Sequence, residues 1–147
     1  LPHTDITALP LEAFMRQALT NLDLWEREGI PAPHAQGLIE VDENHIEVLD
    51  ENNNCKGGFR FPQLDVPVAT YCSGTKKNDQ DSCCVYFSEE KLKKLYPTRR
   101  DYIDKIFKAI DVLEEQRFFS VEDADQMKLD ILKLPVPCRD HSSKFEE

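Results

Sequence analysis

Apolar residues recur at steps of three and four along residues 11–28, and this spacing predicts a helix with one apolar face. Gly29 follows as a left-handed cap, and Pro31 and Pro33 prevent the helix from continuing. We expect the apolar face to pack against a sheet or another helix. Its members are Leu11, Phe14, Met15, Ala18, Leu19, Leu22 and Trp25.

The next segments predict extended structure. Residues 38–49 alternate between apolar and polar around a polar stretch at 42–44, a pattern typical of a β-hairpin. The polar tract 50–54 then predicts a loop. In residues 57–71, a double glycine and two prolines interrupt an apolar run. Because proline cannot donate to a strand ladder, this stretch predicts an irregular edge segment laid against something larger.

Three capping signals predict helices in the second half of the chain. Ser88, Thr98 and Ser120 each precede a run with helical spacing, and Asp101 completes a capping box with Thr98. Pro97 ends the first of these helices, the second runs to about residue 113 and the third to about residue 133. The expected buried side chains of the first two are Leu92, Leu95, Tyr102, Ile103, Ile106, Phe107, Ile110 and Leu113.

Together these elements predict an α+β fold: an amphipathic helix, a β-hairpin and a C-terminal cluster of helices. A length of 147 residues suits a single unit, and no internal boundary divides residues 1–147. The 28 acidic residues outnumber the 18 basic ones, so the formal net charge of -10 repels phosphate backbones and argues against nucleic acid as a partner. No apolar run approaches the roughly 18 residues of a membrane span.

Five cysteines occur at Cys55, Cys72, Cys83, Cys84 and Cys138, and their scatter favours disulfides over a metal site. Cys83 and Cys84 are adjacent, and closing a ring between neighbours strains the peptide, so we expect them to bond to different partners. An odd number leaves one thiol unpaired or bonded to another chain. This interpretation predicts a secreted protein, and the alternative is a cytosolic protein with reduced cysteines.

The usual catalytic and metal motifs are missing from the chain. There is no Gly-x-Ser-x-Gly elbow, no glycine-rich phosphate loop and no His-Glu-x-x-His zinc helix, and we predict no cofactor. Asp50, Asn52 and Asn54 resemble the start of a calcium loop, but Cys55 and Phe61 replace the glycine and glutamate that the loop needs. We therefore interpret this tract as a polar turn.

Among the four histidines, His3 has the most suggestive context. It lies in a His-x-Asp sequence directly before the first helix, where a hydrolase with the chain order Ser, acid, His would present its general base. The alternative is an ordered loop residue whose partner is Asp5. We interpret His34, His45 and His141 as solvated surface groups.

Several ordered phrases resemble one family. Leu-Pro at 9–10, Leu-Asp-x-Trp at 22–25, Gly-Gly-x-Arg at 57–60, Val-Pro-x-Ala-Thr-Tyr at 66–71 and Phe-x-x-x-x-Asp-Ala at 118–124 follow one another in order. Together they resemble the C-terminal part of largely uncharacterised α/β-hydrolase-domain proteins with an esterase-like fold. The cysteine-rich loop at 76–84 departs from that pattern.

This resemblance implies the C-terminal chain or fragment of a secreted serine hydrolase or esterase, active only with an upstream part that supplies the serine and the acid. His3 is then the candidate triad histidine. A start at Leu1 without methionine or a signal-peptide pattern fits a processed or truncated chain. The implied partner is the N-terminal part of the same precursor, linked through the odd cysteine. The alternative is a non-catalytic structural or interaction protein that retains the fold.

Overall fold

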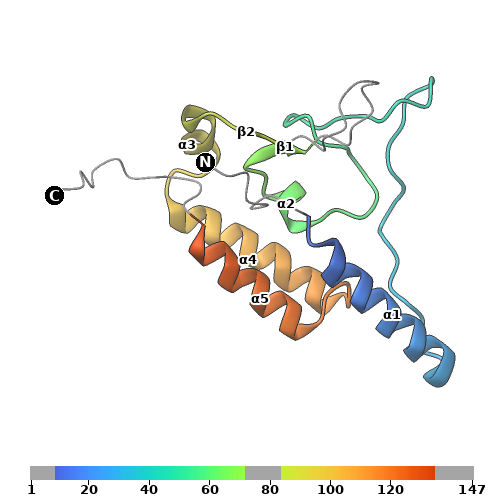
Figure 1. The fold of residues 1–147 in the computed structure, drawn as a ribbon. Coiled ribbons are helices and arrows are strands. Elements are labelled where there is room, and N and C mark those ends of the chain that lie inside the picture. Colours follow the sequence, from blue (N-terminus) through green and yellow to red (C-terminus); the bar gives the residue numbers. More distant parts are fainter. Residues whose placement is uncertain (1–8, 72–83, 135–147) are drawn as a thin grey trace.

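A computed structural model of the chain describes residues 9–71 and 84–134. Figure 1 shows two long helices, α4 and α5, lying side by side, with the small sheet and α2 on one side of α4 and with α1 toward one end of the pair. This mixture of helices and a small antiparallel sheet confirms the predicted α+β pattern. The elements are α1 (Leu11–Glu28), α2 (Pro62–Asp65), β1 (Ala69–Tyr71), β2 (Cys84–Tyr86), α3 (Glu89–Leu95), α4 (Arg99–Glu115) and α5 (Val121–Lys133).

The core forms where α4 meets α5 and residues 57–68, which we call the segment before β1. Tyr102, Ile106 and Ile110 of α4 recur every four residues and are buried, so one face of this helix is fully covered. Burying each isoleucine side chain contributes roughly 1.5–3 kcal/mol. The core cluster comprises Val66, Val68, Leu92, Tyr96, Tyr102, Ile106, Ile110, Ala124 and Ile131.

The predicted caps start the three C-terminal helices. The Ser88 side chain accepts a hydrogen bond from the backbone N–H of Lys91, and Ser120 accepts one from Asp123. Thr98 and Asp101 form the reciprocal capping box of α4, as predicted. Cap chemistry depends only on neighbours along the chain, and for this reason these starts are readable from the sequence.

The segment 57–71 is irregular, as its prolines predict. Pro62 begins the single-turn helix α2, and Val66 and Val68 then enter the core. β1 follows and pairs antiparallel with β2, with Thr70 opposite Val85. Residues 66–69 are therefore buried, and the segment contributes one short strand to a two-stranded sheet.

Residues 38–57 close into a ring of three extended segments. The backbone N–H of Glu40 donates to the carbonyl of Lys56, that of Val48 to Glu40, and that of Lys56 to Val48, each at 2.9 Å. The three residues lie eight positions apart, so each segment pairs with both of the others. Gly57 has a φ of 75°, and a Cβ there would lie 2.3 Å from the Leu38 carbonyl oxygen. The ring closes because this position is glycine.

Two similar turns connect the segments of the ring. The Asp42 side chain accepts hydrogen bonds from the N–H groups of Asn44 and Ile46, and Asp50 does the same for Asn52 and Asn54. The residue at the fourth position of each turn has a positive φ, as hairpins with a three-residue loop require. The predicted hairpin is thus confirmed at its first turn. The tract 50–54 forms a second turn, which agrees with its interpretation as a polar turn.

Helix α1 has the predicted bounds, and Gly29 caps it with a φ of 70°. The prediction that its apolar stripe packs against a sheet or another helix was wrong for most of its large side chains within the described residues, although Phe14 does pack. Ala13 and Asn21 are the buried residues of α1, whereas Leu22 and Trp25 are 59% and 50% exposed. The other large stripe residues on this outer side, which are also at least half exposed, are Leu11, Met15 and Leu19.

Contacts with the α4–α5 connection, with the start of α5 and with Phe59 set the rotation of α1. The Asn21 amide donates to the carbonyl of Arg117 at 2.7 Å, and Arg16 pairs with Asp123 at 2.5 Å. The ring of Phe14 lies 4.6 Å from that of Phe59, within a cluster of aromatic side chains. The cluster comprises Phe14, Phe59, Phe61, Phe118 and Phe119. These contacts turn the stripe outward.

Of the helices described, none combines the length and the apolar character needed to cross a membrane.

Candidate functional site

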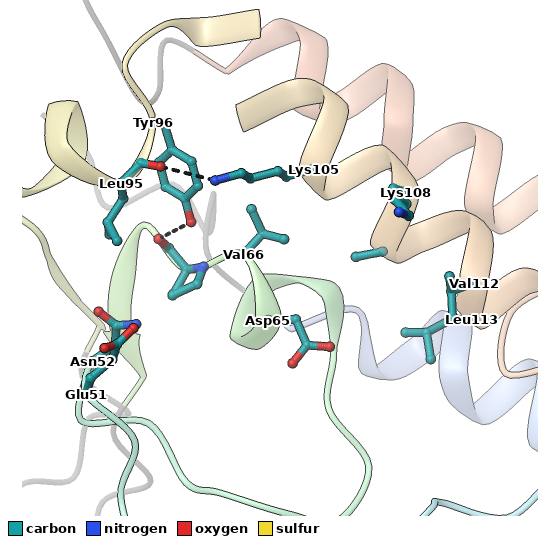
Figure 2. Close-up of a pocket in the computed structure, with 12 residues that line it drawn as sticks. Glu51, Asn52, Asp65, Val66, Leu95, Tyr96, Lys105, Lys108, Val112 and Leu113 are labelled. Carbon is teal, nitrogen blue, oxygen red and sulfur yellow. Dashed lines mark hydrogen bonds between the residues drawn. The ribbon is translucent and has the colours of Figure 1, made fainter. Parts of the chain in front are cut away.

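A groove of about 510 Å³ lies between α4, the segment before β1 and the second turn of the ring. Figure 2 shows Leu95 and Tyr96 on one side and Lys105, Lys108 and Val112 of α4 on the other. The floor is mostly apolar, whereas charged groups stand at the rim. The lining residues are Glu51, Asn52, Asp65, Val66, Pro67, Leu95, Tyr96, Lys105, Lys108, Ala109, Val112 and Leu113.

Tyr96 holds one wall of the groove in place. Its hydroxyl donates a hydrogen bond to the Pro67 carbonyl at 2.9 Å, and its ring lies 5.2 Å from that of Tyr102. Burial raises the pKa of the Tyr96 phenol above its ordinary value, with a smaller contribution from Tyr102. The phenol is therefore protonated at neutral pH and acts as a fixed hydrogen-bond donor.

The two long sides of the groove carry opposite charges. Lys105 donates to the Leu95 carbonyl at 3.3 Å, and its ammonium lies 5.2 Å from the centre of the Tyr96 ring. Lys108 is exposed on the same helix. Glu51 and Asp65 lie on the other side (Figure 2). Such a groove can hold an apolar group with a charged end, but the described lining contains no Ser, Thr, Cys or His that could attack a carbonyl.

Arg60 joins the groove to the ring of extended segments. Its guanidinium pairs with Asp65 at 2.7 Å and with Asp50 at 2.9 Å, and it donates to the carbonyls of Leu64 and Cys55. The side chain is 21% exposed, so water screens these contacts only in part. One side chain thus connects the second turn, α2 and the start of the segment before β1.

Asp50 keeps its charge in this cluster. Partial burial opposes ionisation, but hydrogen bonds from the backbone N–H groups of Asn54 and Asn52, together with Arg60, outweigh it and lower the pKa of Asp50. The Asn54 side chain is itself fully buried, donates to the Ala69 carbonyl and accepts from the Tyr71 N–H. Asp50 and Asn54 are therefore structural, which agrees with the interpretation of this tract as a polar turn.

No group of three or more potential metal ligands occurs within residues 9–71 and 84–134. The candidate histidine His3 and its neighbour Asp5 lie outside the described residues, as does His141. His34 and His45 are exposed on the surface of the described structure. Their interpretation as surface groups agrees with these positions, and the role of His3 stays a prediction.

Cys55 is a free thiol, and no disulfide forms within the described part of the chain. Its sulfur donates to the Glu47 carboxylate at 3.7 Å, and burial, followed by the charge of Glu47, raises the pKa of the thiol. Cys72, Cys83 and Cys138 lie outside the described residues, and only the backbone of Cys84 is described. The expected disulfide bridges, whose pairing the sequence leaves open, stay a prediction.

Sequence reasoning missed three features of this site: the role of Arg60, the ring of extended segments and the groove. Arg60 was noted only as part of a family phrase, since its partners Asp50 and Asp65 lie ten and five residues away. A signal for the ring was present, because Asp-Glu-Asn occurs at 42–44 and again at 50–52, eight residues later. The groove itself depends on how α4 packs, and no local pattern indicates it.

Comparison with protein families identifies a family for this chain. Residues 2–128 match the family model described as an alpha/beta hydrolase domain. The match covers most of the 147 residues, so the chain belongs to the alpha/beta hydrolase domain family. The comparison with curated proteins and the comparison with solved structures each give no match.

Proposed function

We propose that this chain is the C-terminal chain or fragment of a secreted serine hydrolase that acts on esters. It braces the active site and contributes His3 as the general base, while the remainder of the domain contributes the nucleophilic serine and the acidic residue. Membership of the hydrolase family supports this proposal. The observation that carries it is the outward apolar stripe of α1. Its exposed large side chains resemble a helix face that packs against another part of a domain.

The described residues suit a bracing role. Arg60 and the aromatic cluster around Phe59 fix the segment before β1, and Tyr96 fixes the wall of the groove. None of these groups is an activated nucleophile. A rigid frame of this kind is what a catalytic group on an adjoining loop needs in order to stay within hydrogen-bond reach of its partner.

In the proposed reaction, His3 accepts the hydroxyl proton of the serine as the serine oxygen attacks the ester carbonyl carbon. The tetrahedral intermediate collapses, the bond to the alcohol breaks, and His3 returns the proton to the leaving oxygen. Water then repeats these steps on the acyl-enzyme, releasing the carboxylic acid and restoring the serine.

Two measurements test the proposal in the complete natural polypeptide. A fluorophosphonate probe should label a serine outside residues 1–147. His3→Ala should lower ester turnover by about three orders of magnitude or more, while the matched change His34→Ala leaves it unaltered. Full turnover in His3→Ala would remove this residue from the triad. An intact fold without a labelled serine would favour the non-catalytic alternative.

The proposed secreted location and the link to a second polypeptide depend on the cysteines. Cys55 is the described candidate for the odd thiol, since it is not bonded within the described structure. Intact mass without reduction should exceed that of the 147-residue chain by the mass of the attached polypeptide, and reduction should remove the difference. Five alkylated cysteines without prior reduction would instead indicate a reduced protein.

A further inference from the structure

The outer face of α1 carries a continuous apolar stripe. Leu11, Met15, Leu22 and Trp25 are separated by steps that return to the same side of the helix, and Leu19 lies beside them. All five side chains are at least half exposed. Single exposed apolar residues are ordinary on protein surfaces, but five in a row along one helix mark a binding surface.

The charged side chains beside this stripe that form no ion pair among the described residues are acidic. Glu12 adjoins Leu11 in sequence, and Glu26 adjoins Trp25. Neither carboxylate forms an ion pair in the described structure, whereas Arg16 and Arg27 of the same helix are each paired with an aspartate. The stripe therefore has a rim with a net negative charge, although the charge of Glu12 also acts on Arg16.

This rim argues against a second copy of the chain as the occupant. An antiparallel pair of α1 helices would place Glu12 of one copy near Glu26 of the other, and a parallel pair would place identical carboxylates near each other. Like charges at such positions are destabilising. The net charge of -10 adds a repulsion between copies at longer range.

From the stripe and its acidic rim, we infer that the outer face of α1 is a docking surface for an amphipathic segment that is apolar in its centre and carries Lys or Arg along its edge. We further assign this segment to the remainder of the same hydrolase domain, and in that assignment the inference rests on the proposed function. Apolar contact supplies the affinity, and the charged edge sets the register.

Thiol labelling tests the inference in the polypeptide translated from the complete gene. Leu22→Cys reports on the stripe, and Thr20→Cys is the matched control on an exposed position of the same helix that points away from it. Tryptic mass spectrometry separates each new cysteine from the native cysteines. In the complete polypeptide, labelling of Cys at position 22 should be at least about tenfold slower than in the 147-residue chain, with no such change at position 20.

Equal labelling of the two positions in the complete polypeptide would overturn the docking surface. The double change Glu12→Lys and Glu26→Lys should restore labelling at position 22, and full protection in that variant would overturn the basic edge. Sedimentation should show a monomer for the 147-residue chain, and a dimer with position 22 protected would assign the stripe to self-association. If the thiol at position 22 is protected in the complete polypeptide but the fluorophosphonate probe labels no serine, the docking surface is supported and the proposed catalysis is rejected.

Discussion

At the scale of single residues, Arg60 connects more parts of the molecule than any neighbouring side chain of the segment before β1. Its guanidinium satisfies two carboxylates and two backbone carbonyls, and its planar fork allows all of these contacts at once. A lysine carries the same charge but lacks this geometry. Arg60 is therefore a structural residue.

Arg60→Ala should lower the free energy of unfolding by roughly 2–3 kcal/mol, because Asp50 would remain partly buried with less hydrogen bonding. Urea denaturation measures this change. The matched control is Arg100→Ala, since Arg100 is 84% exposed and forms a surface pair with Asp104. That variant should differ from the parent by less than about 0.5 kcal/mol. Equal stability of both variants would show that Arg60 is not a structural hub.

At the scale of elements, the capping box of α4 predicts a pH dependence. Hydrogen bonds from the Thr98 side chain and backbone lower the pKa of Asp101 relative to the unfolded chain. A lowered folded pKa contributes stability that is present above the unfolded value and is lost as pH falls through the folded value.

Asp101→Asn removes the charge but keeps an oxygen that can accept from Thr98. The parent should therefore be more stable than Asp101→Asn at about pH 7, and the difference should shrink steadily on going to about pH 3. Urea midpoints across this range measure it. Asp104→Asn is the control, because Asp104 forms only an exposed pair. A difference for Asp101→Asn that does not change with pH would exclude the proposed cause.

A glycine can be required because its φ is positive or because a Cβ would have no space. Comparing Gly57 of the ring with Gly29 and Gly37 separates these two reasons. Gly57 has a positive φ and a carbonyl where a Cβ would lie, Gly29 has a positive φ but open space, and Gly37 has open space and no positive φ. Gly29→Ala should cost about 1 kcal/mol, Gly57→Ala clearly more, and Gly37→Ala little or nothing. Thermal unfolding gives this ranking, and equal loss at positions 29 and 57 would contradict the close approach.

Local chemistry explains which elements could be predicted. Thr98, Ser120 and Gly29 act on residues within one turn of themselves, so the sequence indicated these helix ends. The rotation of α1 could not be predicted in this way. Its Ala13–Asn21 side and its Leu22 side are both compatible with helical periodicity, and the choice between them depends on contacts with the distant Arg117 and Phe59.

In the candidate site, too, features set by nearby residues could be predicted from the sequence, whereas features set by distant contacts could not. The polar turn at Asp50 follows from side-chain to backbone hydrogen bonds within four residues, and the sequence indicated it. The groove needs Tyr96 to reach Pro67 across 29 positions, which no short pattern encodes. The role of His3 as a general base was suggested only by the His-x-Asp sequence before the first helix. Ester turnover of the His3→Ala variant tests that role.

At the scale of the whole molecule, the contacts divide the described chain into a core of α4, α5 and the segment before β1, with α1 attached beside it. Helix α1 is held by the aromatic cluster and by polar contacts at Asn21 and Arg16, and its outer face is exposed. Opening of α1 should therefore require less free energy than unfolding of the core.

Phe14→Ala should make this difference visible, because it removes the α1 ring that contacts Phe59, Phe61 and Phe118. Amide hydrogen exchange in α1 should accelerate by about tenfold or more, while the buried turns of α4 around Ile106 keep their protection. Leu19→Ala is the matched control, since Leu19 is 65% exposed, and it should leave exchange in α1 nearly unchanged in the 147-residue chain. Parallel acceleration in α1 and α4 would instead make the described chain one cooperative unit, with α1 as part of its core.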